Sequence, residues 1–204
     1  MSESQNAPLP ATNEDTCGPY FPIPFCDGDR MDLVQPHFAL VNRAGGRPII
    51  LRGRFLDLYG DLAAGVLVEF WQANAAGLYR TPATAGHPDI DPWFDGYARC
   101  RASDGRFELR TVMPGGTVSQ GMARAPHITL TLFSDGIARI VTQVFFAGEA
   151  GNDTDPLLLS LPEPMRERLI ARHDGRRGDG AEVYQIDIVM AGEGETPFFD
   201  DLSS

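Results

Sequence analysis

The residue of this sequence best placed to do chemistry is His127, in the stretch RAPHITLTLF. Apolar and polar residues alternate here, which predicts a β-strand whose side chains share a face at every second position. A metal site on this strand would need its second ligand at position 129, and that residue is Thr129. A neutral hydroxyl is a poor ligand for ferric iron or zinc. From the residues alone, His127 is either an ordinary hydrogen-bonded histidine or what remains of a metal site.

A second group of possible ligands lies in the loop TPATAGHPDIDPWFDGYARC, which contains His87, Asp89 and Asp91. Together with His127, these side chains could hold a cation if the loop folded over the strand. The chain would then be an enzyme by itself. Aspartates next to proline and glycine more often form solvated turns. The other histidines have no obvious partner and are expected at the surface: His37 and His173.

Several classes of protein are excluded by what the sequence lacks. It has no GxSxG, HExxH, P-loop or GxGxxG motif that would indicate a nucleophile or a phosphate site. Its net charge is -11 and no basic block interrupts it, so a nucleic-acid surface is not expected. No run approaches the roughly 20 apolar residues of a membrane span and no signal peptide is apparent, so we expect the cytoplasm. Three cysteines without CxxC spacing argue against a disulfide framework or a structural zinc: Cys17, Cys26 and Cys100.

The elements that must position these residues are mostly strands. Short segments rich in branched and aromatic residues are separated by many of the 22 glycines and 16 prolines. The expected strands lie in RPIILRGRFLDLYGD, AGVLVEFWQANAAG, GRFELRTVMPGG, HITLTLF, ARIVTQVFFAG and AEVYQIDIVMAG. One segment, LPEPMRERLIARHD, predicts a helix, with Met165, Leu169 and Ile170 on one side. The sequence therefore predicts an all-β, two-sheet sandwich with one short helix near the C-terminus.

Two segments fall outside this pattern. Residues 1–45 contain many prolines and no convincing strand, so we expect an extended N-terminal arm that reaches a partner or wraps the sandwich domain of residues 46–204. The long loop carries Trp93, Phe94 and Tyr97, which would be exposed unless something covers them. Long loops with aromatic residues are typical of functional or interfacial segments.

Four motifs together carry a resemblance to a known family. The stretches VEFWQANAAGLYR, DGRFELRTVMPG, APHITLTLF and GEGETPFFD resemble the intradiol ring-cleaving dioxygenases. The likeness extends from TCGPY near the N-terminus to FFDD near the C-terminus, and the PHI strand and GEGET tail are similar to alpha chains of two-subunit members. The resemblance implies a β-sandwich fold. It also implies a catalytic chain that holds a non-haem ferric iron through two tyrosines and two histidines.

Three of the four iron ligands implied by this resemblance are missing here. His127 matches the first histidine of a His-x-His pair, and Thr129 replaces the second. Tyr79 matches a family tyrosine that is not a ligand, and neither residues 81–95 nor residues 114–126, where the ligands should lie, contain a tyrosine. Loss of ligands lowers metal affinity steeply. The resemblance therefore implies that His127 is a relic and that Fe(III) is bound by a beta chain, with no catalytic residue and no metal in this chain.

The same resemblance implies a partner and a shared site. An alpha chain pairs with a catalytic beta chain in a heterodimer that assembles further, and the complex cleaves an aromatic catecholic acid. The arm segment TCGPY matches a segment near that site. The expected contributions to the substrate pocket are Thr16, Gly18, Pro19 and Tyr20. Asp135 occupies a position where a basic residue is expected, and Arg139 nearby could compensate for its charge.

Three hypotheses therefore remain for function. The first is the non-catalytic subunit of an intradiol dioxygenase, inactive when isolated. The second is a self-sufficient metal-dependent dioxygenase with an atypical site, which would bind metal and turn over a catechol alone. The third is a non-catalytic scaffold module that kept the fold and has no dioxygenase partner, and it would not co-purify with a beta-like chain.

Overall fold

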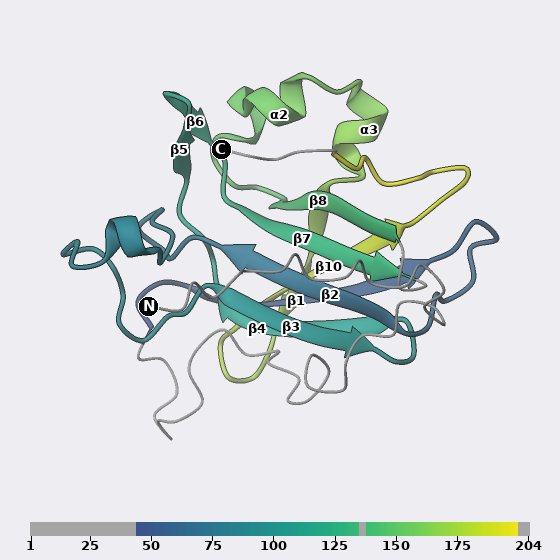
Figure 1. Cartoon of the computed structure of the whole chain (residues 1–204), viewed down its shortest axis with the longest axis horizontal. Helices are drawn as coiled ribbons and strands as arrows, with labels where there is room; N and C mark the ends of the chain where they lie inside the picture. The colour runs from purple at the N-terminus through teal and green to yellow at the C-terminus, as the bar shows by residue number, and fades with distance from the viewer. Residues whose placement is uncertain (1–43, 135–137, 200–204) are drawn as a thin grey trace, which may run out of the picture.

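The computed structural model describes residues 44–134 and 138–199 of the 204-residue chain (Figure 1). The pocket residues expected in the arm, and Asp135, lie outside the described residues: Thr16, Gly18, Pro19 and Tyr20. The first described strand begins at Pro48. The division into an arm and a sandwich domain at residue 45 stays a prediction.

Strands form most of the regular secondary structure of the described chain. They are β1 (Pro48–Leu56), β2 (Val66–Gln72), β3 (Tyr97–Ala102), β4 (Arg106–Val112), β5 (Thr117–Ser119), β6 (Met122–Arg124), β7 (His127–Ser134), β8 (Ala138–Phe146), β9 (Ile170–Arg176) and β10 (Glu182–Val189). The helical turns are η1 (Pro82–Thr84), η2 (Asn152–Thr154), α2 (Pro156–Leu159) and α3 (Glu163–Glu167). Over the described ranges, no helix is long and apolar enough to span a membrane.

Eight strands follow one another in the order β3-β2-β7-β8-β9-β10-β1-β4, and β5 and β6 form a separate hairpin. The long sheet divides at β8 and β9, which pair in parallel through only two residue pairs, Phe145 with Ile170 and Phe146 with Ala171. We call β4-β1-β10-β9 the first half-sheet and β3-β2-β7-β8 the second. Side chains from both halves share one core, so the two halves form the predicted sandwich (Figure 1).

Aromatic rings fill the centre of this core. The Phe107 ring lies 5.2 Å from that of Phe55 and 5.3 Å from that of Phe70, which joins the two half-sheets. Phe146 and Tyr184 meet edge to face at 5.1 Å. Gly53 is required here, because a Cβ at this position would lie 2.3 Å from the Phe107 ring. Burial of such rings stabilises the fold by about 1.5–3 kcal/mol each.

The predicted helix is confirmed over α3 only. The chain becomes strand β9 at Ile170, where the sequence pattern predicted that the helix continues. The reason is tertiary pairing, since Ile170 and Ala171 complete the junction with β8. The apolar residues of the segment do not form one buried stripe either: Leu169 is buried and Met165 is exposed. The second short helix, α2, was not predicted.

Candidate functional site

His127 lies at the first position of β7, between β2 and β8, on the face that points away from the shared core. The side chain is only 4% exposed. Its Nδ1 lies 2.7 Å from the carbonyl oxygen of Ala125, which can only accept, so Nδ1 carries the proton. Its Nε2 then accepts from the hydroxyl of Tyr79 at 3.2 Å. Both ring nitrogens are therefore already engaged by the protein.

The loop after β2 holds Tyr79 in this position. The Asn74 side chain accepts hydrogen bonds from the backbone of Ala76 and Leu78, each at 3.0 Å, and closes the turn. The Tyr79 ring stacks on Trp71, with centroids 5.6 Å apart and planes 15° apart. Burial raises the pKa of Tyr79, so the phenol keeps the proton that it donates to His127.

Burial and charge also keep the imidazole neutral. Desolvation lowers the pKa of His127 below its ordinary value, and the positive charge of Arg124 acts in the same direction. The hydrogen bond to Ala125 and the charge of Asp155 oppose this shift without reversing it. A neutral ring with one donor and one acceptor matches the two partners that the geometry supplies.

Thr129 takes part in a second chain of hydrogen bonds. Its hydroxyl accepts from Gln143 on β8 at 3.3 Å, and the other end of the Gln143 amide accepts from Arg124 at 2.6 Å. Arg124 also binds Asp155 at 2.9 Å. The backbone of Ala125 joins this chain to the histidine, since its N–H donates to Asp155 and its carbonyl accepts from His127. We call the connected side chains the His127 network: Tyr79, Arg124, His127, Thr129, Gln143 and Asp155.

Asp155 connects this network to α2. The carboxylate is fully buried, with 0% of the residue exposed, and one of its oxygens accepts from the backbone of Leu157 at 2.9 Å and Leu158 at 3.2 Å. This is N-capping of α2, and the proline at the first helical position supports it. The helix then covers Phe145, beside which the His127 ring lies at 5.6 Å.

These donors do not fit ferric iron. The Thr129 hydroxyl at the second ligand position is a poor ligand, and burial raises the pKa of the Tyr79 phenol, so this group keeps the proton that it shares with Nε2 of His127. Within residues 44–134 and 138–199, no group of three or more His, Cys, Asp or Glu side chains could hold a metal ion. The geometry therefore assigns the His127 network to structure.

The alternative site in the long loop is not formed. Asp91 is occupied by backbone donors, Gly45 at 2.6 Å and Trp93 at 2.8 Å. The imidazole of His87 lies 3.9 Å from the carboxylate of Asp89, and both side chains are exposed. The structure does not bring these residues together with His127 as a group of ligands. They form the turn that their position beside prolines and glycines favours.

The aromatic residues of this loop are wholly or partly buried against other parts of the chain. Phe94 is 2% exposed and Trp93 packs against the shared core. The Tyr97 hydroxyl donates to Glu69 at 2.9 Å. Burial, with the hydrogen bond and charge of Glu69, raises the pKa of Tyr97 to about 12. The expected exposed aromatic surface is therefore absent at these three residues.

Sequence reasoning missed Arg124, Gln143 and Asp155. No local pattern in the sequence indicated that the first two join a network, because an arginine or glutamine at a strand position is most often a solvated surface residue. Asp155 did have a signal. It directly precedes Pro156 and three leucines, the pattern of an N-cap followed by a proline at the first helical position.

A two-sheet β-sandwich whose strand β7 begins with a buried histidine fits the intradiol ring-cleaving dioxygenases that the sequence resembles. The chain belongs to the intradiol dioxygenase family: the family model described as Dioxygenase (Dioxygenase_C) matches residues 18–192. Intradiol dioxygenases in general depend on ferric iron.

Relatives of known activity include both kinds of chain. The chain is 37% identical to the protocatechuate 3,4-dioxygenase beta chain of Burkholderia cepacia over 159 aligned residues. The alignment covers 74% of this chain and 68% of that one. It is 34% identical over 202 residues to the alpha chain from Burkholderia cepacia, covering 94% and 98%. The alpha chain of Pseudomonas putida is also 34% identical, over 203 residues that cover 94% and 97%.

Solved structures of dioxygenases share the fold. The dioxygenase domain of a carbohydrate-binding fusion protein from Streptomyces sp. SirexAA-E superposes with a TM-score of 0.58 and is 26% identical, covering 91% of this chain and 99% of that one. Hydroxyquinol 1,2-dioxygenase from Pseudomonas putida DLL-E4 gives a TM-score of 0.60 at 19% identity, covering 90% and 68%. The second likeness concerns the fold alone.

Proposed function

We propose that this chain is the non-iron-binding alpha subunit of a protocatechuate 3,4-dioxygenase. Its complex with a beta chain cleaves 3,4-dihydroxybenzoate with dioxygen between the two hydroxylated carbons. The product is 3-carboxy-cis,cis-muconate, a step of the beta-ketoadipate pathway in the cytoplasm. Fe(III) belongs to the beta chain in this proposal, and the isolated alpha chain is inactive.

One observation carries the proposal: His127, which matches a family iron ligand, is hydrogen-bonded to Tyr79 and Ala125, and among the described residues no group of three or more His, Cys, Asp or Glu side chains could hold a metal ion. A catalytic chain needs several convergent ligands for its iron. The alignment with alpha chains over nearly the full length of both proteins supports the same assignment. The 37% identity to a beta chain fits two chains that share a fold.

The chain would contribute fold, subunit contacts and part of the pocket wall. The arm residues Thr16, Gly18, Pro19 and Tyr20 are proposed to line the substrate pocket. Gly18 and Pro19 allow a close and stiff approach of the backbone to a ligand. Asp135 is proposed to face the same pocket, where its charge would disfavour a carboxylate unless Arg139 offsets it.

Co-expression tests the proposal. The chain is produced alone and together with a beta-like chain, and bound iron and the visible tyrosinate-to-iron absorption are measured in each sample. We expect iron, colour and cleavage of 3,4-dihydroxybenzoate in the complex only. Iron and turnover in the isolated chain would establish a self-sufficient enzyme, and failure to co-purify with any beta-like chain would favour a scaffold module.

The variant His127→Gln sharpens this test. If His127 is a relic, the variant complex contains as much iron per heterodimer as the original complex. The matched substitution of a histidine ligand in the beta chain should abolish the colour. A loss of iron caused by His127→Gln would mean that this chain does supply a ligand.

A further inference from the structure

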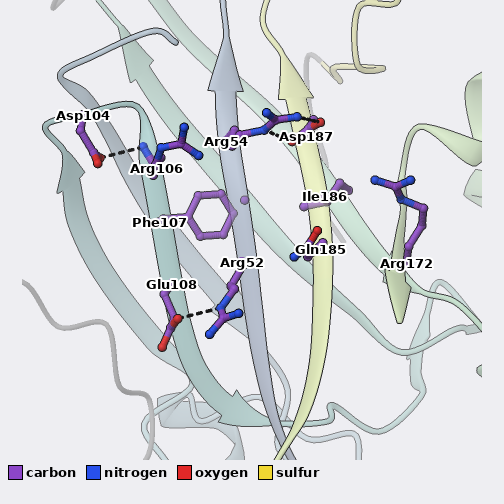
Figure 2. A pocket seen from close by; sticks show the side chains of 11 residues that line it. Arg52, Arg54, Asp104, Arg106, Phe107, Glu108, Arg172, Gln185, Ile186 and Asp187 are labelled. Carbon is purple, nitrogen blue, oxygen red and sulfur yellow. Dashed lines mark hydrogen bonds and ion pairs between the residues drawn. The ribbon is translucent and has the colours of Figure 1, made fainter. Parts of the chain in front are cut away.

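The outer face of the first half-sheet contains a pocket of about 600 Å³ (Figure 2). It lies on β4, β1, β10 and β9, on the side of the half-sheet that faces away from the shared core. Four arginines and three carboxylates contribute to its lining: Arg52, Arg54, Arg106, Arg172, Asp104, Glu108 and Asp187. We call this pocket the arginine groove. Its volume falls within the usual range for small-molecule sites, about 300–1,000 Å³.

Strand register places these side chains in rows. Arg54 on β1 pairs with Arg106 on β4 and with Asp187 on β10. Arg172 on β9 is opposite Gln185 on β10. Figure 2 shows Arg106 on one side of the Arg54–Asp187 pair and Arg172 on the other. The groove is thus bounded by guanidinium groups from two different strands.

Two of the four arginines are neutralised by neighbours. Arg54 makes a two-pronged contact with Asp187, at 2.8 Å and 2.5 Å. Arg52 binds Glu108 at 2.8 Å. The formal charge of the lining is +1, from four arginines and three carboxylates. This positive lining contrasts with the net charge of -11 of the whole chain.

The other two guanidinium groups are unpaired. Across the described residues, neither Arg106 nor Arg172 has a side-chain hydrogen bond or ion pair, and both are exposed. Their positive charges nevertheless act on the Asp187 carboxylate in the groove. Hydrogen bonds from Arg54 lower the pKa of Asp187, and the charges of Arg172 and Arg106 act in the same direction. The groove therefore holds cationic hydrogen-bond donors that the fold itself does not use.

We propose that the arginine groove binds a small polycarboxylate anion through Arg106 and Arg172. Guanidinium groups bind carboxylates through paired, charge-assisted hydrogen bonds. Arg106 and Arg172 lie on strands separated by β1 and β10, and their positions are offset by two residues along the strands. Their backbones are therefore about 16 Å apart at the usual spacings of about 4.8 Å between strands and about 3.4 Å per residue. An anion that contacts both arginines must carry at least two separated carboxylates. This inference is independent of the proposed function, because no residue of the His127 network lines the groove.

Binding of citrate to the full-length chain tests the inference by titration calorimetry, with succinate and acetate compared at constant ionic strength. We expect saturable binding of citrate, weaker binding of succinate and none of acetate. Arg106→Gln and Arg172→Gln should each weaken citrate binding about tenfold, since each removes a charge-assisted contact. Arg101→Gln is the matched control, because Arg101 is an exposed arginine on β3 of the second half-sheet and lies outside the groove. It should change the affinity less than twofold.

Two results would overturn the assignment. Equal weakening by all three variants would show that citrate only screens the overall charge. Absence of citrate binding, combined with loss of the beta-like partner from the Arg106→Gln/Arg172→Gln double variant, would assign the groove to an acidic protein surface. Thermal unfolding of each variant within about 2 °C of the original chain confirms that a lost affinity does not reflect a lost fold.

Discussion

The two outer faces of this sandwich differ in whether their polar side chains have hydrogen-bond partners within the chain. On the second half-sheet, the His127 network is covered by α2, and each of its side chains has a partner within the chain. On the first half-sheet, the arginine groove is open, and Arg106 and Arg172 have no partner among the residues described. On the second half-sheet the polar groups of the network bond to one another, whereas on the first half-sheet two exposed arginines have no such partner among the described residues.

This difference shows how the fold satisfies the polar groups around a buried histidine. Once a metal ligand position is buried, its nitrogen and oxygen atoms must be satisfied, because an unpaired buried polar group costs about 1–3 kcal/mol. Tyr79, Ala125 and Gln143 supply those bonds to His127 and Thr129. A network completed in this way stabilises the fold and leaves no capacity for a ligand. The groove retains that capacity because water satisfies its exposed arginines.

The largest effect should come from Asp155→Ala. The substitution removes four hydrogen-bond acceptor contacts and leaves Arg124, whose side chain is 12% exposed, without its counter-charge. Breaking a buried pair in this way typically costs about 3–5 kcal/mol. Urea unfolding should show that loss, and thermal unfolding a fall of about 10 °C. Asp89→Ala, at an exposed carboxylate, should stay within about 0.5 kcal/mol. A loss below about 1 kcal/mol for Asp155→Ala would refute a structural role for the network.

A smaller effect is expected from Tyr79→Phe. The stacked ring on Trp71 is kept, but His127 loses the donor to its Nε2 and becomes a buried acceptor without a partner. We expect a loss of about 1–2 kcal/mol in the free energy of unfolding. Tyr59→Phe is the matched control, because Tyr59 is 81% exposed, and it should change the free energy by no more than a few tenths of a kcal/mol. Equal effects of the two substitutions would show that the bond to His127 contributes nothing.

The buried histidine should also give the fold a measurable pH dependence. Burial lowers the pKa of His127, so the folded state binds this proton only at a lower pH than the unfolded state does. The neutral, buried histidine makes its full contribution to the free energy of unfolding above the unfolded pKa of about 6.5. This contribution is lost as the pH falls from there towards the lower pKa of the folded state. Within that window the stability should decrease by up to about 1.4 kcal/mol per pH unit. Urea midpoints measured from pH 8 to pH 5 should therefore fall more steeply for the original chain than for His127→Gln. Parallel curves would mean that His127 has the same pKa in the folded and unfolded states.

Much of the fold could be predicted because period-two alternation persists through its strands. In β7, Ile128, Leu130 and Leu132 are buried in the shared core as their spacing indicates. The helix prediction extended too far because the residues around Ile170 suit either structure, and only the distant strand β8 decides between them. Pairing between segments that are far apart in sequence leaves no local signal.

The candidate site was predictable only in part for the same reason. That Thr129 stands two residues from His127 is visible in the sequence itself. Arg124 and Asp155 of the His127 network are 31 positions apart and meet only in the folded chain. The arginine groove also escaped notice, because its four arginines are distributed over three strands of the sheet.

The smallest effect on stability should come from the groove itself. Arg172→Gln removes a cation that has no ion pair across the described chain, so the fold loses only a weak, exposed attraction between Arg172 and Asp187. We expect a change within about 0.5 kcal/mol in urea unfolding, and Arg106→Gln should behave alike. Arg54→Ala, which breaks an exposed ion pair with Asp187, should cost no more than about 1 kcal/mol. The contrast with Asp155→Ala then separates side chains that hold the fold from side chains available to a ligand. A loss above about 1 kcal/mol for Arg172→Gln would place this arginine in the first group and remove the basis for an anion site.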